Sequence, residues 1–473
     1  MPGRVRHFRD DEIMLKIGRI DKMKQESVHD KTKKIRSKAL RIVIGIICGI
    51  LGLAAILFGI YKLAIDPYRG VNRVSAETLP LDEMITAEQA AEDIDYVMEM
   101  YRERHPAWLE DNNTRVADVE RQYLEEVGNL KDSGISEISV LEEWQMISRI
   151  MHCLYDGHSN VFSSNSNTRY LEDFSMLRTY GPPVMIDGRS YEDVLHDFCG
   201  VFQYETESYA QAVFDSNIIC NEDYLRWTGI DTSDGIDMVF DTGEGGTESC
   251  HYDFVPLEDV AGREEGEDSD EKWVYYDIDE ENGIGIFTLT SCRYDNEYKR
   301  TVRDFFEAVN ESGIEHIIVD LRWNGGGSSL VGDEFIHYLD VDGYYSWPVH
   351  VRYGSYLFKW DKSYMKNNRK DPLYHGDLYV LTNQRTFSAA MDFAMDIMDN
   401  DLGIIVGEAS GNLPDSYGDI LMFDTPNSHL NFSISYKRWF RIDETKSGQP
   451  LDPDYPCSSE EAMDRAYELI LGK

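Results

Sequence analysis

The apolar run from Ile42 to Tyr61 constrains the fold of this chain more than any other feature. It reads IVIGIICGILGLAAILFGIY, twenty residues without a charge. A helix of that length is about 30 Å long, the thickness of the hydrocarbon core of a bilayer. A buried core helix would carry a polar stripe, and a cleaved signal peptide would have a shorter apolar run with a cleavage site close behind it. We therefore predict an uncleaved transmembrane signal anchor at residues 42–61.

Charge is divided unevenly on the two sides of this run. Residues 1–41 hold 13 Lys and Arg against 6 Asp and Glu, so the formal net charge of −41 leaves −48 on the rest of the chain. Basic flanks stay in the cytoplasm. We expect a single-pass cell-membrane protein with a basic cytoplasmic tail at residues 1–41 and an extracytoplasmic body. Such an acidic body is repelled by phosphate backbones, which excludes nucleic acid as a partner.

The segments after the span differ in their residue patterns. We predict a linker at residues 62–84, a helical domain at 85–158 and an inserted mixed domain with an acidic loop at 159–282. Thr86 and Gln89 have the spacing of a capping box at the start of the first helix. The apolar spacing predicts three helices in the helical domain: Thr86–Arg104, Val116–Leu130 and Val140–Leu154.

Residues 283–473 alternate short apolar strands with helices. Nearly all-apolar strands of this kind are buried on both faces, so the pattern predicts a layered α/β core with largely parallel strands. The expected strands are residues 283–289, 316–321, 377–382 and 403–408, and the expected helices are residues 296–310 and 388–400.

A glycine run follows one of these strands, in HIIVDLRWNGGGSS at residues 316–329. Gly325, Gly326 and Gly327 allow the backbone to turn sharply and to bring bare N–H groups against a ligand. The run lacks the Lys-Ser/Thr of a P-loop and the spacing of a dinucleotide fingerprint. Taken alone, it is a turn or an anion cradle.

Ser388 stands where a strand passes into a helix, in DLYVLTNQRTFSAAMDFA at residues 377–394. A serine at this place either caps the helix or uses its positive end to stabilise an oxyanion. A nucleophilic serine needs a base with a pKa near neutrality, which histidine supplies. His158, in MHCLYDGHSNVF at residues 151–162, is the candidate base.

Together these segments resemble the C-terminal-processing and tricorn-core serine peptidases, a family that also includes retinoid-binding relatives. IIVGEASGNLPDSYGD at residues 404–419 and the later PNSHLNFSISYKRWFRID are similar to the family as well. The resemblance is strong from Gly283 to Pro456 and weaker from Thr86 to His158. It is slight over residues 180–259, where many relatives carry a PDZ domain and where this chain has no clear carboxylate-binding loop.

The resemblance implies a crotonase/ClpP-like core with Ser388 as nucleophile. It also implies an oxyanion hole formed by the N–H groups of Ala389 and of one glycine of the Gly325–Gly327 run, with Gly326 preferred over Gly325. The bacterial branch of the family uses a lysine base beyond the serine, but no lysine or arginine occurs between Ser388 and His429. The tricorn-like branch uses an upstream histidine, whose position His158 matches.

The acid that orients the imidazole should follow the serine helix and lie near the end of the chain. Glu444 and Asp452 both fit, and the spacing does not choose between them. That branch can also carry a serine immediately before the histidine, where this chain has Gly157, so the pattern does not support a four-residue relay.

The sequence thus predicts a membrane-anchored extracytoplasmic serine peptidase that acts on peptide or protein substrates through an acyl-enzyme. No metal and no cofactor is expected, and the chain has no CxxC pair for structural zinc. Two alternatives stay open. One is a binding or scaffold ectodomain that keeps the fold without turnover, and the other is an esterase acting on the cell envelope.

Overall fold

The computed structural model describes residues 7–68, 71, 76–111, 113–243, 245–261 and 272–472. It divides into two compact units, Met1–Arg69 and Gly70–Lys473. Three apolar cores, all in the second unit, draw their side chains from Val71 to Ile470.

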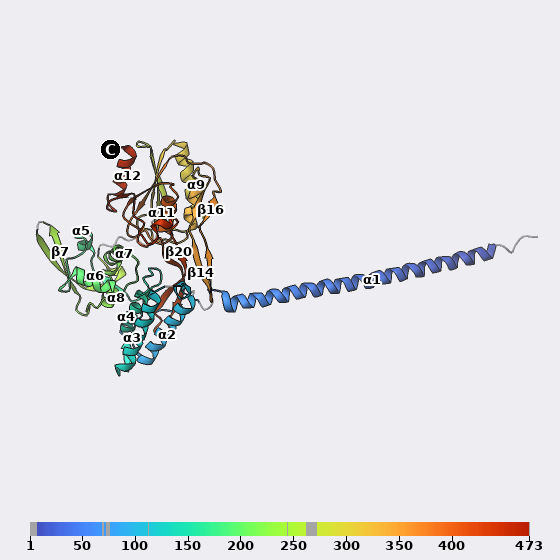
Figure 1. The fold of residues 1–473 in the computed structure, drawn as a ribbon, viewed down its shortest axis with the longest axis horizontal. Helices are drawn as coiled ribbons and strands as arrows, with labels where there is room; N and C mark the ends of the chain where they lie inside the picture. Colours follow the sequence, from blue (N-terminus) through green and yellow to red (C-terminus); the bar gives the residue numbers. More distant parts are fainter. Residues whose placement is uncertain are drawn as a thin grey trace, which may run out of the picture. The chain divides into compact units, whose positions relative to one another are not determined.

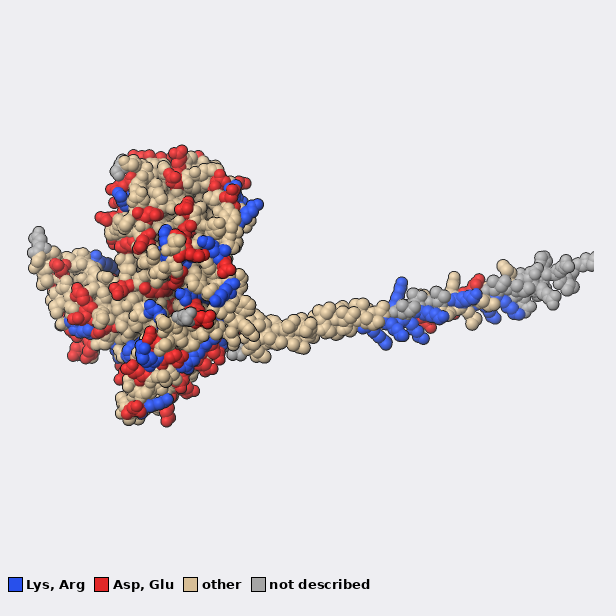
Figure 2. Space-filling view, in the orientation of Figure 1, with Lys and Arg blue, Asp and Glu red and all other residues tan. Residues whose placement is uncertain are grey.

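The first unit is one long helix, α1 (His7–Ile60), which continues into the π-helical turn η1 (Tyr61–Ile65). Its stretch Gly18–Ile65 contains a window with a mean hydropathy of 2.8. Figure 2 shows Lys and Arg side chains along the earlier part of the helix and an uncharged stretch after them. By length and composition this helix is a candidate membrane span.

Three amphipathic helices open the second unit, close to the ranges that the sequence predicts. They are α2 (Ala87–Arg104), α3 (Arg115–Asp132) and α4 (Val140–His152). The predicted capping box is confirmed, because the Thr86 hydroxyl accepts from the Gln89 N–H while the Gln89 side chain accepts from the Thr86 N–H. Ser139 and Glu142 form the same arrangement before α4.

A six-stranded sheet lies in the second half of the chain, with the order β10-β11-β12-β17-β18-β21. The edge strand β10 is antiparallel to β11, and the other pairs are parallel. The strands are β10 (Val274–Asp279), β11 (Ile284–Leu289), β12 (His316–Asp320), β17 (Asp377–Thr382), β18 (Ile404–Gly407) and β21 (Tyr455–Pro456).

Alternate side chains of these strands enter two different cores, as strands buried on both faces require. On β12, Ile317 and Val319 join the core under helices α9 (Asn296–Glu311), α10 (Leu330–Ile336) and α11 (Ala389–Asp399). Ile318 joins the core under α12 (Ala462–Leu471) on the opposite face. The sheet is therefore sandwiched between helices (Figure 1).

A second sheet has the order β15-β14-β20-β19, and the short strand β3 (Val161–Phe162) pairs with β20. Its main strands are β14 (Val349–Tyr353), β15 (Tyr356–Trp360), β19 (Tyr417–Asp424) and β20 (Asn431–Trp439). A separate two-stranded ladder joins β13 (Gly343–Ser346) to β16 (Ser363–Lys366). Because β3 begins three residues after His158, its pairing ties the histidine turn to β20.

In sequence, the segment between β3 and β10 forms short helices and small antiparallel sheets within residues 169–256. The strands are β4 (Arg169–Leu171), β5 (Met185–Ile186), β6 (Arg189–Ser190), β7 (Ile236–Gly243), β8 (Gly246–Tyr252) and β9 (Phe254–Pro256). The helices are α5 (Ser175–Tyr180), α6 (Tyr191–Cys199), α7 (Glu207–Val213) and α8 (Glu222–Trp227). Their apolar side chains share one core with α2–α4 and with strands β14, β19 and β20. One core thus crosses the domain boundaries predicted at residues 158 and 282.

Candidate active site

Ser388 lies in a strained turn between β17 and α11. Its φ of 54° and ψ of −127° belong to a region that L-residues rarely adopt. Its backbone N–H donates to Asn412 Oδ1 at 2.6 Å. Its side chain forms no capping hydrogen bond with α11, which removes the capping role as an explanation for this serine. The turn holds Ser388 at the positive end of a helix and leaves its hydroxyl outside the helix ladder.

Gly326 brings the glycine run against Ser388. Its φ is +96°, and a Cβ at this position would lie 2.7 Å from the Ser388 Cβ and 3.0 Å from the Ala389 nitrogen. The Gly326 N–H donates to Asn324 Oδ1 at 2.9 Å. The backbone N–H groups of Gly325 and Ala389 have no partner among the residues that the structure describes. Of the three groups expected at an oxyanion hole, these two have N–H groups available.

The turn that carries His158 is fastened to β20 by hydrogen bonds. Ser433 Oγ donates to the His158 carbonyl at 2.7 Å, and the Asn160 N–H donates to Ser433 Oγ at 2.9 Å. The His158 ring packs against the ring of Phe387, the residue before Ser388, with centroids 4.7 Å apart. The structure therefore brings the predicted base beside the predicted nucleophile turn, from a distant part of the chain.

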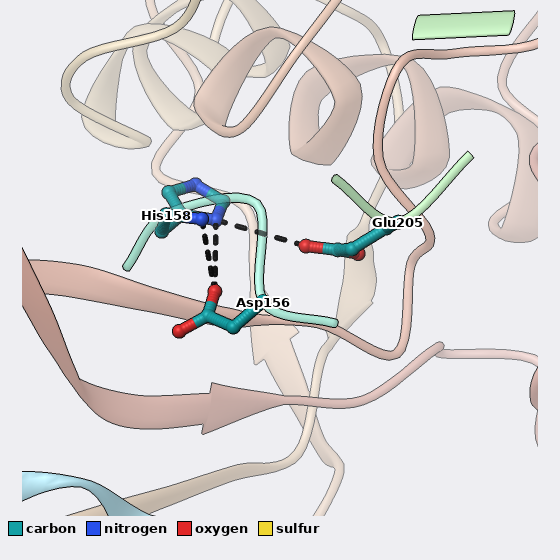
Figure 3. Close-up of side chains that lie close together, drawn as sticks. All are labelled: Asp156, His158 and Glu205. Atoms are coloured by element: carbon teal, nitrogen blue, oxygen red, sulfur yellow. Dashed lines mark hydrogen bonds and ion pairs between the residues drawn. The ribbon is translucent and has the colours of Figure 1, made fainter. Parts of the chain in front are cut away.

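Two carboxylates face the His158 ring (Figure 3). Asp156 Oδ1 and Glu205 Oε1 each lie 3.9 Å from His158 Nδ1. Both ring nitrogens are buried, and neither has a hydrogen-bond partner among the described residues. A separation of 3.9 Å is too long for a normal hydrogen bond, but in a buried site it couples the charges strongly.

These charges set the ionisation of the site. Burial lowers the pKa of His158, but Glu205, Asp156 and Asp392 outweigh it and raise that pKa above its ordinary value. Asp392 lies one turn beyond Ser388, and its N–H donates to the Ser388 carbonyl at 2.9 Å. Burial and the charge of Asp419 raise the pKa of Asp392 to about 7, although the charge of His158 opposes this shift.

Glu205 is a site residue that sequence reasoning missed. It lies between α6 and α7, and its two carboxylate oxygens accept the N–H groups of Gly157 at 3.3 Å and Leu413 at 3.0 Å. Those bonds aim the carboxylate at the imidazole. The region around Glu205 carries the weakest resemblance in the chain, and no local pattern distinguishes it from the many other acidic residues.

Asp156 is fixed from behind by a buried polar cluster. The His105 nitrogen Nδ1 accepts the Ala107 N–H at 3.2 Å, so its Nε2 carries the proton and donates to Asp156 Oδ2 at 3.1 Å. Ser159 Oγ donates to the same oxygen at 2.5 Å. Burial raises the pKa of Asp156, but these hydrogen bonds and the charge of His158 bring it down to about 2. Asp156 is therefore a fixed negative charge.

Glu444 and Asp452, the acids expected from the sequence, lie elsewhere on the surface. Both are exposed, and Glu444 begins a short 3₁₀-helix, η5 (Glu444–Lys446). Neither forms an ion pair with His158 within the described part of the chain, where Asp156 and Glu205 take that place. The carboxylates that face the imidazole come from segments upstream of the serine rather than from the segment after it.

A pocket opens beside Glu205. A pocket of about 340 Å³ is bordered by Glu205 and Leu413 and also by Glu110, Tyr417 and Arg438. Ligand atoms of Asp156, His158 and Glu205 all lie within 4.8 Å of one another, which is close enough to share one cation. The Asp156 carboxylate already accepts hydrogen bonds from His105, from Ser159 and from the backbone N–H of His158, an arrangement suited to acid–base chemistry.

Comparison with known proteins decides the family. The family model of Peptidase family S41 matches residues 283–456, the segment that holds Ser388 and the glycine run. The chain carries an S41 peptidase segment. It is therefore a serine-type peptidase, and the family resemblance of its sequence motifs is confirmed. A search among curated proteins finds no match to this S41 peptidase.

Solved structures with a similar fold include two of CPAF. CPAF complexed with lactacystin has a TM-score of 0.59 and 12% identity, covering 82% of this chain and 97% of the other. Mature CPAF has a TM-score of 0.58 and 12% identity, covering 82% and 96%. A peptidase structure from Parabacteroides merdae has a TM-score of 0.46 and 14% identity, covering 82% and 97%. At such identities the CPAF likeness shows a shared fold.

Proposed function

We propose that this S41 peptidase cleaves peptide bonds in peptide or protein substrates with Ser388 as nucleophile, His158 as general base and Glu205 as the acid that orients the imidazole. The observation that carries the proposal is the strained Ser388 turn, whose neighbour Phe387 packs 4.7 Å from the His158 ring. Glu205 replaces Glu444 and Asp452 in this role because its carboxylate faces His158 Nδ1.

In the first half of the reaction, Ser388 Oγ attacks the peptide carbonyl while His158 accepts its proton. The N–H groups of Ala389 and Gly325 stabilise the oxyanion at the start of α11. His158 then protonates the leaving amine, and the acyl-enzyme remains. Water resolves the acyl-enzyme with His158 again as base.

Gly326 has a different role in this proposal from the one that the sequence suggested. Its N–H is bonded to Asn324, which supports a structural function in shaping the loop. The close approach of Gly326 to Ser388 supports a function as spacer between the glycine loop and the nucleophile turn.

We further propose that α1 is an uncleaved signal anchor, with residues 1–41 in the cytoplasm and the peptidase unit outside. The twenty uncharged residues 42–61 and the basic flank before them support this topology. The parallel sheet of β11, β12, β17 and β18 supports a crotonase/ClpP-like core. Residues 85–158 and 159–282 are proposed as its helical and inserted domains.

A fluorophosphonate probe tests the nucleophile and the base together. The intact chain in detergent should label at Ser388, and labelling should disappear in Ser388→Ala and fall strongly in His158→Ala. Peptide hydrolysis should follow the labelling, with circular dichroism showing that both variants stay folded. Hydrolysis by Ser388→Ala at the rate of the unmodified enzyme would refute the assignment.

A further inference from the structure

Large apolar side chains gather in one surface region formed by β13, β15 and β16. Five of them lie there between residues 345 and 364, and Tyr356 and Trp360 are 64% and 48% exposed. We name this region the aromatic–lysine surface, defined by Tyr345, Tyr356, Phe358, Trp360, Lys362, Tyr364 and Lys366. Contiguous exposed apolar surface of this kind marks an interaction site.

The aromatic side chains of β15 form one row along the strand. Tyr356, Phe358 and Trp360 alternate along β15, so they lie on one face of this edge strand. The ring centroids of Phe358 lie 6.5 Å from Tyr356 and 6.1 Å from Trp360. The strand β16 begins three residues after Trp360, and its Tyr364 packs on Tyr345 with ring centroids 5.3 Å apart.

The charge of this surface is opposite to that of the protein. Residues 356–366 contain three lysines and one acidic residue, in a chain whose formal net charge is −41. Neither Lys362 nor Lys366 pairs with a carboxylate in the described part of the chain. Lys362 donates to the Ile442 carbonyl and lies 5.4 Å from the Tyr345 ring centroid. The lysines are therefore available to an anionic partner.

We propose that the aromatic–lysine surface docks on a lipid bilayer that contains anionic headgroups. Tyr and Trp favour the bilayer interface, because their rings are apolar and their polar ends reach the headgroups. Lysines bury their methylene stems while their ammonium groups meet lipid phosphates. Exposed aromatic rings beside lysines suit the headgroup layer of a bilayer better than they suit a second copy of this acidic chain.

The inference rests on the proposed anchor, which supplies the bilayer. The turn η1 ends at Ile65 and the compact unit begins at Gly70, so only a few residues tether the peptidase unit to the proposed span. A tether this short keeps the aromatic–lysine surface at a high effective concentration near lipid. Docking would then hold the peptidase unit in a fixed orientation on the membrane.

The edge strand β15 also offers a different partner. Its outer edge has no paired strand within the described residues, and an exposed edge can add a strand from a second copy of the chain or from a peptide. The lysines favour the bilayer over a second copy, because two copies would bring like charges together. The experiment below separates these partners.

The test uses the full chain reconstituted in phosphatidylcholine vesicles, with or without phosphatidylglycerol, that carry doxyl-labelled lipid. Trp360 in contact with lipid should be quenched, and Trp360→Phe should remove that quenched component of the fluorescence. Trp273→Phe, which removes a tryptophan beside β10, should leave the component in place. Replacing Lys362 and Lys366 by Gln together should abolish the increase caused by phosphatidylglycerol.

Equal quenching in Trp360→Phe and in the unmodified chain would overturn the docking proposal. A concentration-dependent dimer that disappears when Tyr356, Phe358 and Trp360 become Ser, without lipid quenching, would also overturn it and assign the surface to a second copy. Peptide hydrolysis by the same variants in detergent should be unchanged. Loss of probe labelling in the unmodified chain would instead count against the peptidase proposal, and recovery of the chain without detergent would count against the anchor.

Discussion

His158 is surrounded by three carboxylates, and their arrangement determines how the site responds to pH. Glu205 and Asp156 lie 3.9 Å from its Nδ1, and Asp392 acts from one turn beyond Ser388. Because their charges favour the protonated ring, they raise the pKa of His158. A base with a raised pKa is stronger when neutral, but it becomes protonated at a higher pH.

Glu205→Gln tests this coupling. We expect kcat/KM to fall roughly 10²- to 10⁴-fold, because the imidazole loses the charge that orients it and stabilises its protonated form. His158 acts as base only when neutral, so activity falls as the pH drops through its pKa. Glutamine removes one of the charges that raise this pKa, and the acid limb of the pH profile of kcat/KM should move to lower pH.

Glu444→Gln is the matched control for this substitution, because it removes the same charge from an exposed carboxylate. Its pH profile should coincide with that of the unmodified enzyme. If Glu444→Gln instead lost activity and Glu205→Gln did not, the acid expected from the sequence would be the correct one.

Gly326→Ala tests the close approach of the glycine loop. A Cβ would lie 2.7 Å from the Ser388 Cβ at a φ of +96°, so we expect the free energy of unfolding to fall by about 1–3 kcal/mol. Activity should fall with it as the nucleophile turn shifts. Gly325→Ala has open space around its Cβ, and its unfolding free energy in urea should stay within about 0.5 kcal/mol of the original. Equal stability of both variants would contradict the packing argument.

At the scale of elements, helix ends stabilise the region that carries the histidine turn. Helix α4 leads directly to that turn, and α2 packs beside it in the same core. Both helices begin with a complete capping box, whereas Thr114 before α3 makes no capping bond. The difference offers a comparison within a single helical layer.

Thr86→Ala should lower the free energy of unfolding by about 1 kcal/mol, because the Gln89 N–H loses its acceptor at the start of α2. Thr114→Ala removes the same hydroxyl from a position without a capping bond, and its stability should barely change. Urea denaturation of the two variants gives the comparison. Equal losses would show that the Thr86 hydroxyl contributes no capping energy.

At the scale of the whole molecule, the sequence predicts most of the architecture. The strands around residues 317 and 380 are short apolar runs, and such runs predict buried strands directly. Ser388, His158 and the glycines were predicted as site residues because their segments resemble a family. Glu205 was not, because its role depends on a loop docking against Gly157 and Leu413, and tertiary contacts of this kind leave no periodicity in the sequence.

Removal of residues 1–69 tests whether the second unit folds and labels at Ser388 without the first. All three apolar cores draw their side chains from Val71 to Ile470, so residues 70–473 should fold without α1. We expect this fragment to be recovered without detergent, to show cooperative thermal unfolding and to label at Ser388, while the full chain sediments with membranes. Its Ser388→Ala variant controls for non-specific labelling. A fragment that stays unfolded would mean that α1 contributes to the peptidase fold itself, and the anchor would then be more than a tether.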